Sequence, residues 1–154
     1  MKHLDQEHVL PGIYPVADFM AGTVATDIFE VMSAEGAAFD IIKGVGTTGT
    51  STITVLACDD TSPSNTSAVT FFYRISTTPD VWGDWTAATT AGFVTTAGSN
   101  QMYQVWVDAA VLAEVGYGYV KLVATESVND PVIGAILGRV VGLRYGPQPT
   151  SLID

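Results

Sequence analysis

Hydrophobic and polar residues alternate along much of this chain, with the period of two that is typical of β-strands exposed on one face. The clearest alternation covers residues 101–107 and resumes over residues 119–125. In the first run the apolar side carries Tyr103, Val105 and Val107, and in the second it carries Val120, Leu122 and Ala124. Both runs are therefore predicted to be strands that pack one face against a core.

A short helical turn is predicted between these two strands. Asp108 stands just before the segment AAVLAEVG, and an aspartate there can accept hydrogen bonds from the free N–H groups of a helix start. Gly116 can end the turn, because glycine adopts a positive φ without a steric penalty from Cβ.

Further strands are predicted wherever apolar and β-branched residues lie between groups of turn residues. The candidates are residues 23–32, which have imperfect alternation and room for a bulge, 38–44, 52–58, 68–76, and shorter strands near 85–88 and 93–95. Residues 52–58 and 68–76 flank the loop DDTSPSN, so they are predicted to form an antiparallel hairpin.

The run VIGAILGRVVGLRY, residues 132–145, has glycines at every fourth position. This spacing imitates the small-residue face of a membrane helix. The run is too short to span a bilayer, contains Arg139 and is rich in β-branched residues. We therefore predict a long strand that packs closely against a neighbour at its glycines.

Scarce helical periodicity and frequent turns predict an all-β fold, an antiparallel β-sandwich of barrel-like form with one short helical turn. The predicted organisation is an extended N-terminal arm (residues 1–22), a β-sandwich domain (23–145) and a C-terminal tail (146–154). The core is expected from the strands between Thr52 and Tyr145.

Composition narrows the classes of function. The 154 residues are 47% hydrophobic and only 14% charged, with a net charge of −10 and six Lys plus Arg, against about 25% charged residues in ordinary domains. Clustered cations are absent from the sequence, which disfavours direct binding of nucleic acid or of an anionic membrane. The sequence starts without a signal-peptide pattern, and synthesis in a reducing cytoplasm is expected. Cys58 is predicted to be a small core residue.

A catalytic or metal site is not expected. His3 and His8 both lie in the predicted arm, where no rigid frame would hold a metal ion. The acids Asp59, Asp60, Asp80 and Asp84 lack the spacing of a calcium loop. We predict neither an enzyme nor a bound cofactor.

Two groups of residues are candidates for partner binding. The predicted arm contains more apolar side chains than a solvated tail would, and it is expected either to dock on a neighbour or to fold on its own sheet edge. Trp82 and Trp85 flank a Gly-Asp pair in a loop and are expected to anchor a protein interface, to stack on a sugar or to cover an open end of the sandwich. The candidate residues are Leu4, Val9, Leu10, Ile13, Tyr14, Phe19, Met20, Trp82 and Trp85.

The order of these features resembles small β-sandwich decoration proteins, or cement proteins, on the heads of tailed phages. The resemblance covers residues 51–132 and lies in three segments: STITVLACDDTSPSNTSAVTFFYRIS, DVWGDW, and QMYQVWVDAAVLAEVGYGYVKLVATES with its NDPV turn. It implies a structural virion protein on the capsid exterior that bridges subunits of the major capsid protein, with homo-oligomeric or lattice contacts. Alternatives are a carbohydrate-binding module that uses Trp82 and Trp85, or another phage structural part such as a tail-tube or head-completion protein.

Overall fold

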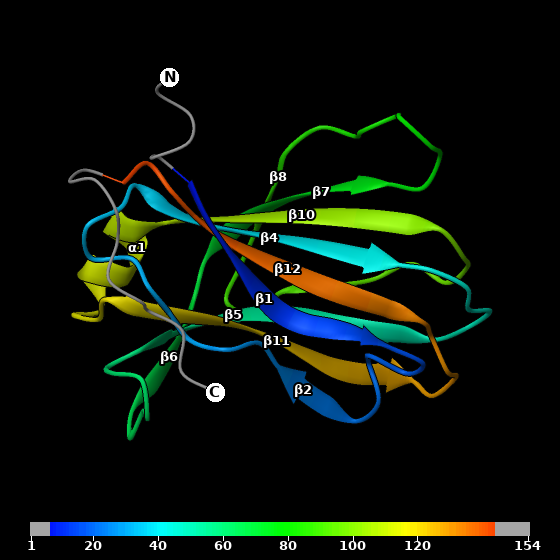
Figure 1. The fold of residues 1–154 in the computed structure, drawn as a ribbon, viewed down its shortest axis with the longest axis horizontal. Coiled ribbons are helices and arrows are strands. Elements are labelled where there is room, and N and C mark those ends of the chain that lie inside the picture. Colours follow the sequence, from blue (N-terminus) through cyan, green and yellow to red (C-terminus); the bar gives the residue numbers. More distant parts are fainter. Residues whose placement is uncertain (1–6, 144–154) are drawn as a thin grey trace.

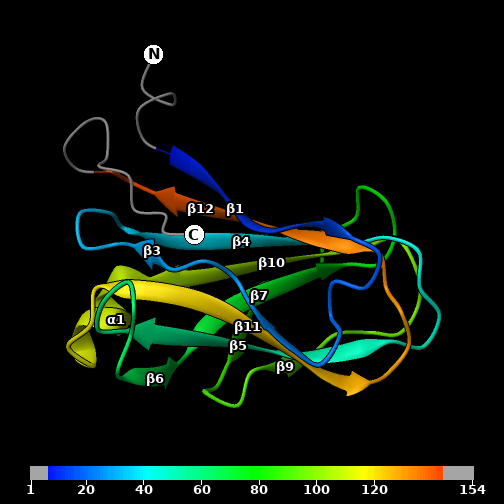
Figure 2. The same ribbon diagram turned by 60° about the horizontal axis from the view of Figure 1, so that its bottom comes forward.

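Two antiparallel sheets pack face to face in this computed structural model, which describes residues 7–143 (Figures 1 and 2). Sheet A has the strand order β1-β12-β4-β10-β7-β8, and sheet B has the order β2-β11-β5-β6, with β3 on β11 and β9 on β5. The strands of sheet A are β1 (Glu7–Val16), β12 (Gly134–Val141), β4 (Gly36–Lys43), β10 (Gln101–Asp108), β7 (Phe71–Ser76) and β8 (Thr86–Ala88). Those of sheet B are β2 (Thr23–Ala25), β3 (Phe29–Glu30), β11 (Tyr119–Val128), β5 (Thr50–Cys58), β6 (Thr66–Val69) and β9 (Phe93–Val94). The predicted all-β sandwich is confirmed, and no closed barrel forms.

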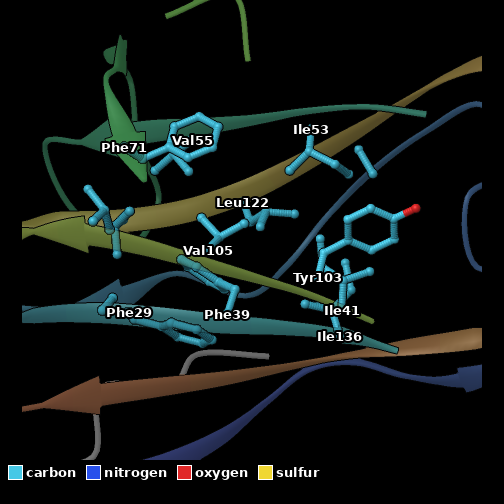
Figure 3. Packing of buried hydrophobic residues seen from close by; sticks show 14 of the residues in the cluster. Phe29, Phe39, Ile41, Ile53, Val55, Phe71, Tyr103, Val105, Leu122 and Ile136 are labelled. Atoms are coloured by element: carbon cyan, nitrogen blue, oxygen red, sulfur yellow. The ribbon is translucent and has the colours of Figure 1, made fainter. Parts of the chain in front are cut away.

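The alternation of the sequence corresponds to the two faces of each sheet. In β10 the side chains of Tyr103, Val105 and Val107 are buried, and those of the residues between them are not. The same holds in β5 and β11 of the facing sheet. Figure 3 shows the side chains of both sheets meeting between the layers, where dispersion contacts and apolar burial stabilise the fold.

The helical turn between β10 and β11 is confirmed as α1 (Ala109–Glu114), at one end of the sandwich (Figure 1). Asp108 Oδ1 accepts a hydrogen bond of 2.8 Å from the backbone N–H of Ala110, as expected for an N-cap. Gly116 has φ +82°, so it provides the predicted left-handed end of the turn.

The predicted strand over residues 68–76 is divided in the structure. β6 pairs with β5 in sheet B, whereas β7 pairs with β10 in sheet A, and the chain crosses between the sheets at Thr70. The predicted hairpin is therefore correct for β6 and wrong for β7. Val69 and Phe71 are both buried on either side of the exposed Thr70, so the alternation continues through the crossing and does not reveal it.

The glycine-rich run forms the strand β12, as predicted, and its glycines lie where the core packs most closely. Gly138 stands against the ring of Phe29, and Gly134 stands against the ring of Phe19, with no room for a methyl group at either position. In the described part of the chain, no helix is long and apolar enough to cross a membrane.

The N-terminal third contributes more to the core than the sequence indicated. β1 pairs with β12 at the edge of sheet A, with two irregularities in register, which is the expected alternative of folding on the chain's own sheet edge. Phe29 and Phe39, at the centre of the core, stack with centroids 5.4 Å apart. The expectation that the strands between residues 52 and 145 form the core is incomplete, because β3 and β4 supply these two rings.

The predicted strand over residues 23–32 consists of two short strands, β2 and β3, both paired with β11. Between them the Thr26 hydroxyl accepts a hydrogen bond of 3.0 Å from the backbone N–H of Leu122. This bond replaces a ladder bond and explains the imperfect alternation. The predicted C-terminal tail, residues 146–154, lies outside the described residues.

Candidate partner-binding face

The outer face of sheet A, which points away from the core, is the most distinctive surface of the described chain. Antiparallel pairing brings one outward side chain from each strand into a row across the sheet. One row consists of Val9, Arg139, Ala38, Trp106 and Phe72. The adjacent row consists of Pro11, Leu137, Asp40, Gln104 and Arg74.

Large apolar side chains on this face are exposed to solvent. Phe72 is 50% exposed and Trp85 is 48% exposed, and four smaller groups accompany them: Val9, Ile42, Met102 and Leu137. On the outer face of sheet B, the outward positions of β5 are occupied mainly by threonine: Thr50, Thr52 and Thr54, followed by Leu56. A continuous apolar patch with polar surroundings marks a contact surface more often than scattered apolar residues do.

Arg74, on β7, is held by two tryptophans and an amide. Its Cζ lies 4.7 Å from the ring centroid of Trp82 and 4.8 Å from that of Trp85. Its Nε and Nη2 donate hydrogen bonds of 2.7 and 2.5 Å to Gln104 Oε1. These contacts draw the loop between β7 and β8 over the outside of sheet A. Trp85 also lines a hollow beside Arg74, whereas Trp82 lines a second hollow with Lys43 and Gly44 near the end of β4.

Arg139, on β12, is the second cation of this face. Its Nη2 lies 2.9 Å from Asp40 Oδ2, and its Nη1 lies 3.8 Å from Glu7 Oε2. Arg139 Nε and Asp40 Oδ1 are buried and have no hydrogen-bond partner among residues 7–143. Buried polar atoms of this kind are normally paired, so the site has unused donor and acceptor capacity.

A hollow of about 290 Å³ lies between the two arginines, over the small side chain of Ala38. Its walls combine aromatic, cationic, acidic and amide groups. The lining residues are Glu7, Ala38, Arg74, Trp85, Gln104, Val105, Trp106, Arg139 and Val141.

Two acidic groups of the described loops are held by hydrogen bonds from loop residues, one across two loops and one within a single loop. The Thr47 hydroxyl and the Thr48 backbone N–H donate to Asp130 and lower the pKa of that carboxyl to about 2. The side-chain amide of Asn65 donates to Asp59 and lowers the pKa of Asp59. Within residues 7–143, no group of three or more His, Cys, Asp or Glu side chains is placed to hold a metal ion.

One buried lysine was not anticipated from the sequence. Lys43 is 1% exposed, and its Nζ donates hydrogen bonds to the carbonyls of Gly49 (2.8 Å) and Thr96 (2.6 Å). Burial lowers the pKa of Lys43. Since its partners are backbone carbonyls of two loops, Lys43 joins these loops at one end of the sandwich.

The residues predicted to bind a partner are spread over several environments. Leu10, Phe19 and Met20 are buried in the chain's own core, and Ile13 is partly buried against it. In this fold those side chains stabilise the domain itself. Val9 and Trp85 lie on the outer face of sheet A, Tyr14 is exposed, Trp82 contacts Arg74, and Leu4 lies outside the described residues.

Other residues of this face were not predicted, although the sequence contains a signal for them. In β7 and β10, the positions between buried residues carry Phe72, Met102 and Trp106 rather than small polar groups. A strand with large apolar residues on both sides has an outer face that is suited to contact with another apolar surface.

No protein-family model matches the chain, and no curated protein matches it. Among solved structures, the fold is similar to the SPBc2 prophage-derived protein YomS, with 15% identity, a TM-score of 0.48, and coverage of 92% of this chain and 98% of that chain. It is also similar to a chain in the structure of infectious bursal disease virus strain Gx (14% identity, TM-score 0.27, 88% of this chain). A mutant VP2 protein of the same virus gives 10% identity, a TM-score of 0.27 and 96% of this chain.

This chain spans 40% and 45% of the length of those two viral chains. Likenesses at these identities and TM-scores are not evidence of a shared function.

Proposed function

We propose that this protein is a structural component of a phage virion that binds the outside of the head and bridges subunits of the major capsid protein. In this proposal it docks through the outer face of sheet A. A protein that binds the assembled shell and not the free subunits stabilises the shell by mass action, by about 2.7 kcal/mol when its concentration is 100 times Kd.

The observation that carries the docking part of the proposal is the exposure of six large apolar side chains on one face of one sheet: Val9, Ile42, Phe72, Trp85, Met102 and Leu137. Protein interfaces are enriched in aromatic residues, Met and Arg, and this face combines these types. The resemblance of residues 51–132 to decoration proteins supports the virion part of the proposal.

The face suits docking better than the edge of sheet A does. The edge strand β1 contains Pro11 and Pro15, which have no backbone N–H to offer to an added strand. Prolines on an edge strand oppose edge-to-edge pairing. Contact through side chains of the sheet face does not need those donors.

Point variants test the docking face better than removal of the N-terminal segment. Deleting residues 1–20 would remove β1 and three buried side chains, Leu10, Phe19 and Met20, and would be expected to destabilise the domain. Phe72→Ser and Leu137→Ser change partly exposed side chains and should each lower the free energy of unfolding by only about 1 kcal/mol.

The assay is co-sedimentation of the protein with purified phage heads that lack it, followed by imaging of the decorated heads. Phe72→Ser and Leu137→Ser should weaken binding to the heads. Val94→Ser, which changes an exposed valine of β9 in sheet B, is the matched control and should bind as the original does. Unchanged binding by both face variants would contradict the proposed surface.

The predicted sugar platform is the competing function for the same loop. Arg74 lies over the rings of both Trp82 and Trp85 and covers ring surface that a sugar would stack on. Binding of a glycan panel that is lost in Trp85→Ala, without any binding to heads, would favour the carbohydrate-binding function. Formation of rings in solution without a head would favour a tail-tube protein.

A further inference from the structure

The outer face of sheet A contains an arginine that is positioned for a carboxylate but has none. Arg74 forms no ion pair with any residue between 7 and 143, although Asp80 and Asp84 belong to the neighbouring loop. Its contacts are two indole rings and the neutral oxygen of Gln104. Among the cations of residues 7–143 only Arg139 forms ion pairs, so Arg74 is a partly buried cation whose contacts on this face are all with neutral groups.

We infer that Arg74 and Gln104 receive an acidic side chain of the partner protein, a Glu or Asp that projects from an apolar surface. This inference rests on the proposed docking face and specifies the chemistry of the partner at its centre. We take the occupant to be a protein side chain, because the exposed apolar side chains around the hollow, Phe72 and Leu137 among them, need a partner surface wider than a small molecule to cover them.

Arg74 and Gln104 keep donor groups that their mutual hydrogen bonds do not use. Arg74 donates through Nε and Nη2, while its Nη1 has no hydrogen-bond partner among residues 7–143. Gln104 lines the hollow and accepts through Oε1, so its amide N–H groups are not used in the contact with Arg74. A carboxylate with two oxygens can accept from both groups at once, which gives direction as well as attraction.

The surroundings favour such a bond energetically. The two indole rings hold the guanidinium in place, so little conformational entropy is lost when a partner binds. Phe72 and Trp106 are adjacent on the same face, and an apolar partner surface against them would exclude water from the ion pair. Exclusion of water strengthens the attraction between opposite charges.

Arg139, the other cation of this face, is less suited than Arg74 to bind a partner's carboxylate. Arg139 already has Asp40 and Glu7 as ion-pair partners, so its charge is compensated within the chain. A partner carboxylate at Arg139 would compete directly with these two acids, whereas at Arg74 it would meet no carboxylate already paired with the arginine, although Glu7 also lines the hollow. The charge complementarity of the face is therefore concentrated at Arg74.

Tryptophan fluorescence provides a direct assay, because the chain has three tryptophans and all three belong to this site. Trp82 and Trp85 contact Arg74, and Trp85 and Trp106 line the hollow. The probe is a short capped peptide with one glutamate between leucines and valines, and the control probe is the same peptide with glutamine. Both are titrated while the fluorescence and the indole N–H signals in NMR spectra are recorded.

The glutamate peptide should bind at least about tenfold more tightly than the glutamine peptide, which is the size of one charge-assisted hydrogen bond. Arg74→Gln should remove this difference, and Arg74→Lys, which keeps the charge without the planar fork, should retain part of it. Lys121→Gln, which removes an outward cation of β11 in sheet B, should leave it unchanged. Circular dichroism of each variant verifies that it is folded.

Equal binding of the two peptides, a difference that persists in folded Arg74→Gln, or binding of glucuronate without binding of the peptide would overturn the inference. Binding of the variants to phage heads distinguishes a failure of this inference from a failure of the proposed function on which it rests. If Phe72→Ser loses binding to heads while Arg74→Gln binds them normally, the acidic anchor is wrong and the docking face stands. If both variants bind heads normally, the docking face itself is wrong.

Discussion

The close approach of β12 to the core makes a sharp prediction about Gly138. In the substitution Gly138→Ala, the new methyl group would overlap carbons Cε2 and Cζ of the Phe29 ring. Phe29 is 0% exposed and stacks on Phe39 with an interplanar angle of 18°. Because the ring is fully buried and stacked, either the stacked pair or the strand must shift.

The expected cost follows from this confinement. Overpacking a well-packed core typically costs 1–3 kcal/mol, and we expect about 3 kcal/mol here because the obstacle is a buried ring rather than a flexible chain end. For a domain of this size each 1 kcal/mol lowers Tm by roughly 2–4 °C. Gly138→Ala should therefore lower Tm by about 6–12 °C.

The assay is thermal and urea unfolding of the variant beside a matched glycine. In Gly83→Ala the new methyl group meets only the carbonyl oxygen of Ile75 at 3.4 Å, an ordinary contact, so Tm should stay the same or rise slightly. The double variant Gly138→Ala with Phe29→Leu should be at least about 1 kcal/mol more stable than the sum of the single changes, since both act on one contact. A Tm of Gly138→Ala equal to that of the original protein would refute the reasoning.

Three further changes test other parts of the structure. Tyr103→Phe removes a buried hydroxyl that donates to Gln101 Oε1 (2.6 Å) and accepts from the Thr96 N–H (2.9 Å). We expect the free energy of unfolding in urea to fall by about 1–3 kcal/mol. An unchanged urea midpoint would contradict these bonds. Asp130 has a pKa of about 2 in the fold, below the value of about 3.9 for a free aspartate, so its contribution to stability is present above pH 4 and is lost as the pH falls toward 2. Asp130→Asn should flatten the fall of Tm in that interval, and Asp84→Asn is the exposed control; parallel curves for Asp130→Asn and the original protein would exclude this role. Cys58 is buried, and burial raises the pKa of its thiol, so a thiol reagent should modify it only as fast as the protein unfolds, whereas rapid reaction in native buffer would show that the site is open.

The sequence alone was sufficient for features that depend on neighbours along the chain. Alternation assigned the buried side of β5, β10 and β11, because successive side chains of a strand point to opposite faces. Asp108 and Gly116 indicated the ends of α1, since capping depends on groups a few residues apart. β-branched residues and Arg139 distinguished the strand β12 from a membrane helix.

Only the tertiary structure decided which strands are neighbours. Alternation assigns a side to each residue but carries no label for the partner strand, so the crossing at Thr70 and the pairing of β1 with β12 were not evident from the sequence. The candidate face depends on the same information. Arg74, Gln104 and Asp40 come from three strands distant in sequence, and the pairing of β7, β10 and β4 places them in one row. Such a row exists only when backbone hydrogen bonds fix the register of every strand that contributes to it.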